Sequence, residues 1–208
     1  MRVWAVFPTC NPERATACAK LWKSKGYLVA IGTEKGFPPI PSVDAHIEWN
    51  MYEGYWKSAN RLGKNVAPFA DYVVYIGDDM EPDPTFTAQE IAASLAGHSP
   101  EVVMQPIGDT AMPGTDRICG SPWVTSTSAA DGVYHEGYWQ FYGDEELFEK
   151  SKRDGLLIQR SDLIQKHHHW CRPGAGIKRT EYQERNSKMY WDMDKKLFME
   201  RKEKGFPG

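Results

Sequence analysis

The stretch RVWAVFPTCNPERATACAKLWKSKGYLVAI, residues 2–31, decides the fold class of this chain. It opens with an apolar run that favours a strand, and Asn11 followed by Pro12 then predicts a helix with Asn11 as its N-cap. The next apolar side chains have helical spacing, and they are Ala15, Cys18, Ala19 and Trp22. A second apolar run covers residues 27–31. Two strands joined by one helix imply a parallel pair, because parallel strands need a crossover connection.

The alternation of strand and helix continues along the chain. Helices are expected over residues 52–69, 86–96 and 144–154, strands over 71–76 and 101–105, a strand or turn over 156–158, and a long charged helix over 178–204. Residues 33–49 and 106–142 lack a clear period and are expected to be irregular, as functional loops often are. This order predicts an α/β domain with a mainly parallel sheet flanked by helices. In such domains the ligand lies outside the carboxyl ends of the strands.

Length, charge and composition exclude several classes of protein. The chain has 208 residues and a formal charge of −3, so we do not expect its whole surface to bind nucleic acid non-specifically. No run approaches the ~20 apolar residues of a membrane span, and the N-terminus lacks the apolar core of a secretory signal. The cysteines, Cys10, Cys18, Cys119 and Cys171, show no C-x-x-C spacing. We therefore expect a reduced, cytoplasmic protein.

Two acidic clusters have the residue types and positions that chemistry requires. Asp78 and Asp79 follow the apolar run 71–76 directly, and neighbouring carboxylates repel each other unless a cation balances them. Hard divalent ions prefer such oxygen ligands. The triplet at 144–146, Asp-Glu-Glu, begins an expected helix, where the helix dipole favours acids and where one carboxylate could act as a general base.

A run of three histidines forms the third cluster. On an extended segment alternate residues share a face, so His167 and His169 are expected to point together and His168 away from them. Imidazole suits Mn²⁺ better than Mg²⁺. A site of carboxylate, imidazole and phosphate would therefore favour manganese.

Taken in order, these clusters resemble the motifs of the GT-A glycosyltransferases, in particular the family 2-like group. The similar segments are VFPTCNPERA (6–15) for the nucleotide-contacting loop, YVVYIGDDMEPDP (72–84) for the acidic DXD motif, YGDEELFEKSKRDG (142–155) for the base and DLIQKHHHW (162–170) for the late His-x-His. The resemblance covers residues 2–170. It implies a Rossmann-like GT-A sheet, a nucleotide-sugar donor such as a UDP- or GDP-sugar, and Mn²⁺ or Mg²⁺ as the cofactor.

The resemblance also assigns roles to particular residues. The implied metal ligands are Asp79, His167 and His169. The implied donor-binding residues are Pro8, Thr9, Glu34 and Asp78. The implied catalytic base is Asp144, with Glu145 and then Glu146 as the remaining candidates in the same triplet. Aromatic side chains of the stretch 123–142 would stack on the acceptor or on a sugar face, and the candidates are Trp123, Tyr138 and Trp139.

The chain departs from the family pattern in ways that leave several assignments open. The acidic motif reads Asp-Asp-Met, not Asp-x-Asp, so either Asp78 or Asp79 could be the sole metal ligand. Glu81 and Asp83 could also reach the cleft. The acid that contacts the nucleobase could be Asp44 instead of Glu34.

The resemblance implies an inverting glycosyltransferase of the hexosyltransferase class, in which the base takes the proton of the attacking acceptor hydroxyl. A variant of this function keeps the chemistry but uses a hydroxylated base in DNA as the acceptor. A nucleotidyltransferase is a second possibility, although the loop after residue 7 has no glycine to hold a triphosphate. A third is an inactive sugar-nucleotide binder, although Asp79 and Asp144 are both present.

The C-terminal part differs in charge from the rest of the chain. Residues 172–204 contain ten Lys or Arg against six Asp or Glu, so they could contact an anionic acceptor such as nucleic acid. A glycan or a protein is an equally open acceptor. We expect residues 1–170 to form the catalytic domain and residues 171–208 a helical extension packed on it. The extension could also form a homodimer.

Overall fold

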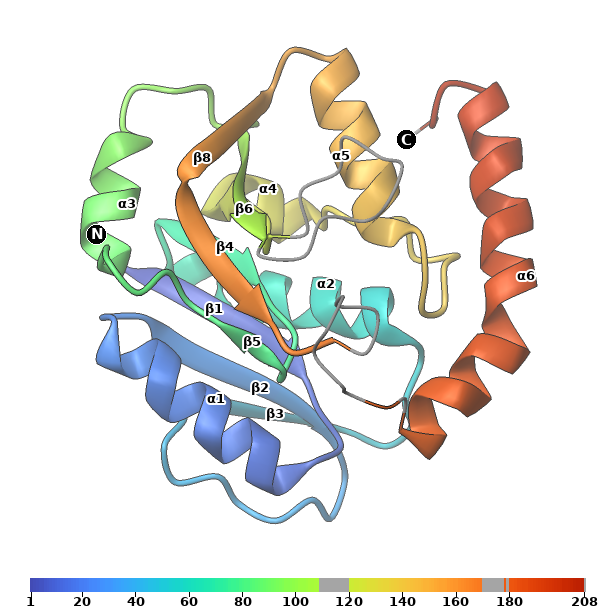
Figure 1. Ribbon diagram of the computed structural model, residues 1–208, viewed down its shortest axis with the longest axis horizontal. Helices are drawn as coiled ribbons and strands as arrows, with labels where there is room; N and C mark the ends of the chain where they lie inside the picture. The colour runs from blue at the N-terminus through green and yellow to red at the C-terminus, as the bar shows by residue number, and fades with distance from the viewer. Residues whose placement is uncertain (109–119, 170–177, 179, 208) are drawn as a thin grey trace.

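The computed structural model describes residues 1–108, 120–169, 178 and 180–207, and Figure 1 shows their arrangement. Cys119, Trp170 and Cys171 lie outside these residues. The strands are β1 (Val3–Pro8), β2 (Leu28–Glu34), β3 (Ala45–Trp49), β4 (Tyr72–Tyr75), β5 (Met80–Glu81), β6 (Val103–Gly108), β7 (Trp123–Thr125) and β8 (Leu157–His167). The helices are α1 (Pro12–Ser24), α2 (Tyr55–Val66), a 3₁₀ turn (Ala67–Phe69), α3 (Ala88–Ser94), α4 (Ser126–Asp131), α5 (Gly143–Arg153) and α6 (Glu181–Glu203).

The described strands form one sheet in the order β3-β2-β1-β4-β7-β6-β8-β5. Strand β1 lies between β2 and β4 and is parallel to both, with Ala5 opposite Val29 on one side and Val74 on the other. The pairs β2–β3 and β6–β8 are also parallel. Strand β7 is antiparallel to β4 and β6, and β5 is antiparallel to β8. The prediction of a mainly parallel sheet flanked by helices is confirmed.

Helix α1 begins as the sequence predicts. The Asn11 side chain accepts a hydrogen bond from the backbone N–H of Arg14 and caps the helix, with Pro12 in its first turn. The four residues expected on its inner face, Ala15, Cys18, Ala19 and Trp22, are all buried. Because α1 directly follows β1, it begins at the carboxyl edge of the sheet.

Three elements lie in segments whose sequence has no clear period. Strand β3 lies within residues 33–49, and β7 and α4 lie within residues 106–142, so both segments are less irregular than expected. Strand β8 has 11 residues, whereas a strand or turn of three was expected. Its sequence shows no apolar run because most of its side chains are exposed or half-buried. Its pairing with β6 is also irregular, with a register shift between Pro106 and Ile107.

The core consists of two apolar clusters. One contains Trp22 of α1, Ile91 of α3 and the fully buried Trp123. The other contains Leu62 of α2, Ala129 of α4, Leu147 of α5 and Phe198 of α6. Helix α6 is therefore part of the core, and Figure 1 shows it running along one side of the molecule next to α5. Among the described residues, no helix is long and apolar enough to cross a membrane.

A buried ion pair joins α5 to α6. Arg201 donates from Nε and Nη2 to the two carboxylate oxygens of Glu146, at 2.8 Å each. The Tyr138 hydroxyl donates a third hydrogen bond to Glu146, at 2.8 Å. Burial alone would raise the pKa of Glu146, but the hydrogen bonds from Arg201 and Tyr138 outweigh it and lower that pKa.

We expect Arg201→Met to lower the free energy of unfolding by about 3 kcal/mol at pH 7, because it leaves the Glu146 carboxylate buried without a partner. The pair stabilises the fold at pH values above the unfolded pKa of the carboxyl, and this stabilisation is lost as pH falls through the lowered folded pKa. The difference between wild type and variant should therefore shrink in acid. Urea denaturation at pH 7 and at lower pH measures both quantities.

Lys202→Met is the matched control, because Lys202 pairs with Glu149 at the surface, 2.7 Å away. Its loss should cost less than about 1 kcal/mol. Equal losses in the two variants would contradict the structural role of the buried pair.

Candidate active site

The carboxyl ends of β1 and β4 bring Thr9 and Asp78 together. The Thr9 hydroxyl donates to Asp78 Oδ2 at 2.7 Å, and Arg14 Nη2 lies 2.8 Å from Asp78 Oδ1. Burial raises the pKa of Asp78, and Arg14 and Thr9 offset only part of that effect. Two of the predicted donor residues thus contact each other, with Arg14 of α1 as their positively charged neighbour.

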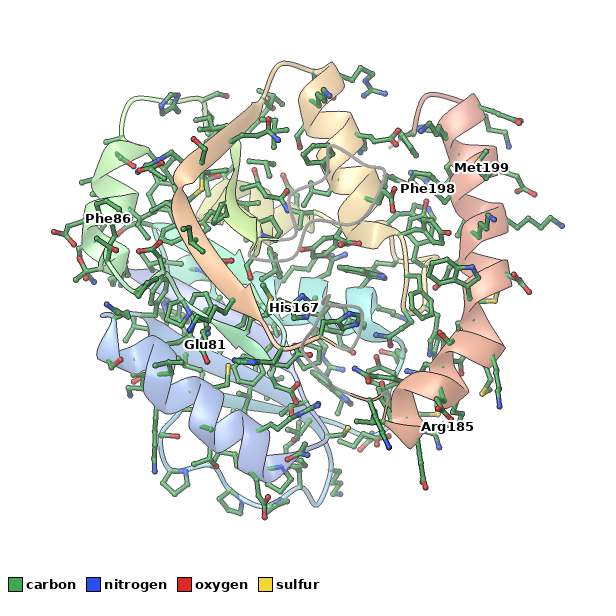
Figure 2. The ribbon with its side chains drawn as sticks, in the orientation of Figure 1. Glu81, Phe86, His167, Arg185, Phe198 and Met199 are labelled. Atoms are coloured by element: carbon green, nitrogen blue, oxygen red, sulfur yellow. The ribbon has the colours of Figure 1, made fainter. Side chains whose placement is uncertain are left out.

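Asp79 meets the histidine run through the pairing of β5 with β8. Met80 is opposite His167 in this antiparallel pair, and the backbone N–H of His168 donates to the Asp79 carbonyl at 2.9 Å. Asp79 Oδ1 lies 3.3 Å from His167 Nε2. A Cβ atom on Gly77 would lie only 2.6 Å from the same oxygen, so the glycine leaves room for this carboxylate. Figure 2 shows His167 near the centre of the molecule.

The alternation expected within the histidine run is confirmed. The rings of His167 and His169 lie with their centroids 4.9 Å apart. His168 points elsewhere, and its Nε2 lies 2.6 Å from Glu81 Oε1. His167 and His169 therefore share the side on which Asp79 lies, and Glu81 is engaged with His168.

The adjacent aspartates differ in the direction in which their pKa values are shifted. Burial would raise its pKa, but the hydrogen bond and charge of His167, together with Arg14 and His169, lower it overall. The pKa of Asp78 is shifted in the opposite direction. Asp79 is therefore the member of the pair that keeps its negative charge more readily.

The residues present fit a divalent metal that also binds the substrate. Within the described parts of the chain, no group of three or more His, Cys, Asp or Glu side chains could hold a metal ion by itself. Asp79 and His167 supply one carboxylate and one imidazole, 3.3 Å apart. Mg²⁺ and similar ions often bind to one or two protein carboxylates and complete their shell with phosphate oxygens and water. Asp79 and His167 therefore fit an ion of this kind.

The acidic triplet occupies the first turn of α5, where its members have different environments. Glu146 is buried and committed to Arg201 and Tyr138, so it is not available as a base. Asp144 and Glu145 are half-buried. The structure thus leaves two of the three acids as candidate bases.

Tyr55, at the start of α2, connects the segment before α5 to the end of β4. Its backbone N–H donates to the Trp139 carbonyl at 2.6 Å, and its hydroxyl donates to the Ile76 carbonyl at 2.8 Å. Ile76 lies two positions before Asp78. A single residue, Tyr55, therefore bridges the segment that leads to Asp144 and the backbone just before the aspartate pair.

Asp83 and Asp44 both have structural roles in this fold. Asp83 accepts hydrogen bonds from the backbone N–H groups of Thr85 and Phe86 and, through its second oxygen, from Ile164 of β8. It is buried, and both of its carboxylate oxygens accept backbone hydrogen bonds. Asp44 pairs with Lys23 at 2.7 Å and accepts from the backbone N–H of Val29.

The remaining donor candidates lie at the same edge of the sheet. Pro8 is the buried last residue of β1, opposite Gly32. Glu34 is the exposed last residue of β2, and its carboxylate accepts from the backbone N–H of Tyr52 at 3.1 Å. The backbone N–H of Thr9 donates to the Gly32 carbonyl at 2.9 Å, so the ends of β1 and β2 lie side by side where the sequence predicts the donor.

Two of the three residues predicted to bind the acceptor are buried in the core, so the prediction was wrong for them. Trp123 is 0% exposed and packs edge-on against Tyr27, and Tyr138 is 1% exposed with its hydroxyl on Glu146. Neither ring has a free face for an acceptor, because each fills the core. Trp139 is half-buried and stacks on Tyr190 of α6, with ring centroids 4.9 Å apart.

Sequence reasoning missed Arg14 and Tyr55. Arg14 carried a usable signal, because an adjacent aspartate pair requires a nearby positive charge and Arg14 follows the N-cap of α1. Tyr55 carried none, since it donates hydrogen bonds to two backbone carbonyls that are distant in sequence.

Comparison with known proteins finds similarity in structure alone. No family model matches the sequence, and no curated protein matches it. The chain superposes on S. aureus TarS 1-349 with a TM-score of 0.58 at 11% identity, covering 79% of this chain and 60% of that one. It thus spans less than two thirds of the TarS fragment.

Two further structures are of glucosyl-3-phosphoglycerate synthase from Mycobacterium tuberculosis. The complex with Mn²⁺, UDP and phosphoglyceric acid gives a TM-score of 0.55 at 12% identity, over 89% of this chain and 74% of that one. The complex with Mg²⁺ and UDP gives 0.54 at 11% identity, over 100% and 80%. At these identities the likeness concerns the fold. The chain therefore has the GT-A-like, Rossmann-related fold of glycosyltransferases.

Proposed function

We propose that the protein is a metal-dependent glycosyltransferase that moves a sugar from a nucleotide-sugar donor to an acceptor hydroxyl. The observation that carries the proposal is the convergence of Asp79 and His167 at the carboxyl edge of the sheet, 3.3 Å apart. A general ligand-binding fold would not require a charged carboxylate and an imidazole at this place. Structures of the same fold with UDP and Mn²⁺ or Mg²⁺ support the proposal.

Each group at the site has a part in the proposed reaction. Pro8, Thr9, Glu34 and Asp78 would bind the donor and make up the donor end of the proposed site. Asp79, with His167 or His169, would hold Mn²⁺ or Mg²⁺. When bound, the metal supplies positive charge that stabilises the departing nucleoside diphosphate.

The proposed transfer is inverting. The acceptor oxygen forms a bond to the anomeric carbon from the face opposite the diphosphate, and the bond between that carbon and the diphosphate oxygen breaks. Asp144, or Glu145 beside it, takes the proton of the acceptor hydroxyl. A positioned base of this kind contributes about 10²–10⁴-fold to a rate.

Hydrolysis of the donor tests the proposal without knowledge of the acceptor. The purified protein is incubated with a panel of UDP- and GDP-sugars in Mn²⁺, in Mg²⁺ and in chelator, and the released nucleoside diphosphate is measured. We expect release from one donor in the presence of metal and none in chelator. Release of pyrophosphate from a nucleoside triphosphate and a sugar phosphate would instead indicate a nucleotidyltransferase. Absence of both turnover and nucleotide binding would overturn the proposal.

A further inference from the structure

Helix α6 holds the backbone segment 139–142, which leads directly into α5. The Asp194 carboxylate of α6 is fully buried and accepts three hydrogen bonds from consecutive backbone N–H groups. These come from Trp139 at 2.9 Å, from Gln140 at 2.8 Å and from Phe141 at 2.8 Å. Hydrogen bonds to a charged acceptor are the stronger kind, and successive N–H groups form a natural anion site. Here the protein fills that site with its own carboxylate.

Ring contacts from α6 fix the same segment. Phe198 stacks on Tyr142 with centroids 5.0 Å apart and planes at 29°, and Trp191 packs edge-on against Phe141. Figure 2 shows Phe198 on the side of α6 that faces α5, whereas Met199, the next residue, is exposed. The segment is therefore bound to α6 through both its backbone and its side chains.

Tyr142 has an unusual backbone conformation. Its φ of 67° lies in the left-handed region, and it is the N-cap of α5 without a side-chain cap. A residue other than glycine keeps this conformation only where its surroundings enforce it. The surroundings on this side are Asp194 and Phe198 of α6. They thus determine the point and the direction in which α5 begins.

The opposite side of the segment is tied to the rest of the site. Tyr55 joins Trp139 to the carbonyl of Ile76. A Cβ atom on Gly143 would lie 2.4 Å from the Trp56 ring, so α5 begins in direct contact with α2. The first turn of α5 is therefore held between α6 and the backbone that leads to the aspartate pair.

We propose that α6 is a positioning element for the candidate base, and that Asp194 acts through segment 139–142 to set the place of Asp144. The inference rests on the proposed function. Asp194 is a positioning residue, because its contacts are with the backbone of the protein. Helix α6, which lies in the C-terminal extension expected from sequence, would then be part of the catalytic apparatus.

Asp194→Asn tests the proposal, with Asp192→Asn as the matched control on the exposed side of the same helix. The amide turns an N–H₂ group toward backbone N–H donors, so the segment should loosen. We expect donor hydrolysis to fall at least about tenfold, since a displacement near 1 Å can cost about 10²-fold. Binding of UDP or GDP with Mn²⁺ should be unchanged, because the donor end lies at the ends of β1, β2 and β4 and not in segment 139–142. The control should behave as wild type.

A double-mutant cycle separates positioning from loss of stability. If Asp194 acts through Asp144, then Asp194→Asn should cause no further loss of rate in an Asp144→Asn background. Additive losses, or equal weakening of nucleotide binding, would overturn the proposal. If Asp194→Asn does not fold, Phe198→Leu replaces it, with the exposed Met199→Leu as its control.

Hydrogen exchange tests the inference independently of activity. In Asp194→Asn the amides of 139–141 and of the first turn of α5 should exchange faster than in Asp192→Asn. If the protein neither turns over a donor nor binds a nucleotide, the proposed function fails, and hydrogen exchange then still tests whether Asp194 fixes the start of α5. Unchanged exchange in the first turn of α5 would overturn the inference, whatever the activity.

Discussion

Asp79→Asn should reduce metal-dependent donor hydrolysis by at least about 10²-fold, the order of loss when one electrostatic stabiliser of a transition state is removed. The amide keeps the shape of the side chain but removes the charge that would hold Mn²⁺ or Mg²⁺. The imidazole of His167, 3.3 Å from Asp79 Oδ1 in the wild type, would remain without its carboxylate neighbour. The rate of nucleoside diphosphate release at saturating Mn²⁺ measures the effect.

Glu81→Gln is the control for this variant. Glu81 is on the same short strand as Met80 but contacts His168, so its charge lies outside the proposed metal site. We expect it to retain a rate close to that of wild type, with the same dependence on metal. If the Asp79→Asn protein kept the wild-type rate and metal dependence, Asp79 would not be a metal ligand.

Asp144→Asn should lower the rate of sugar transfer by about 10²–10⁴-fold, the usual contribution of a positioned general base. The amide cannot accept the proton of the attacking hydroxyl. Binding of UDP or GDP with Mn²⁺ should be unchanged, because Asp144 belongs to α5 and not to the donor end of the proposed site. Steady-state rates, together with calorimetric nucleotide affinities, check both parts.

Glu145→Gln is the matched variant, since Glu145 is the half-buried neighbour in the same helical turn. It should have a much smaller effect than Asp144→Asn. A larger loss of rate in Glu145→Gln than in Asp144→Asn would assign the base to Glu145. Near wild-type rates in both variants would contradict the assignment of the base to this turn of α5.

The elements closest to the donor site were the most predictable from sequence. Strands β1 and β2 and helix α1 combine apolar runs, a capping residue and local contacts, and all three formed as expected. The adjacency of Asp79 and His167 was suggested by motif order, but it is produced by the pairing of Met80 with His167. Such pairing of distant residues has no signature in a local sequence window.

Burial was the least predictable property. Trp123 and Tyr138 are aromatic side chains in a stretch without a clear period, and residue type alone could not distinguish a core ring from an exposed one. Most of strand β8 was not predicted from sequence, for the opposite reason. Its exposed polar residues near the edge of the sheet give no apolar run.

The charged residues of α6 illustrate the same limit. From sequence, Asp194 and Arg201 belong to a long charged helix that could be a solvated face. In the structure Asp194 is fully buried on three backbone N–H groups, and Arg201 neutralises Glu146. A buried charge with partners and an exposed charge are surrounded by the same local pattern of residues in the sequence. Only the fold distinguishes them.

The most direct test of the proposed metal and donor site is calorimetric binding of UDP and GDP to the full chain, with Mn²⁺ and with chelator, in wild type and in Asp79→Asn. We predict that one nucleotide binds wild type at least about tenfold more tightly with Mn²⁺, the lower end of the effects seen when metal sites are disturbed. This difference should be absent in Asp79→Asn. Equal affinity with Mn²⁺ and with chelator in wild type, or no binding of either nucleotide, would contradict the site.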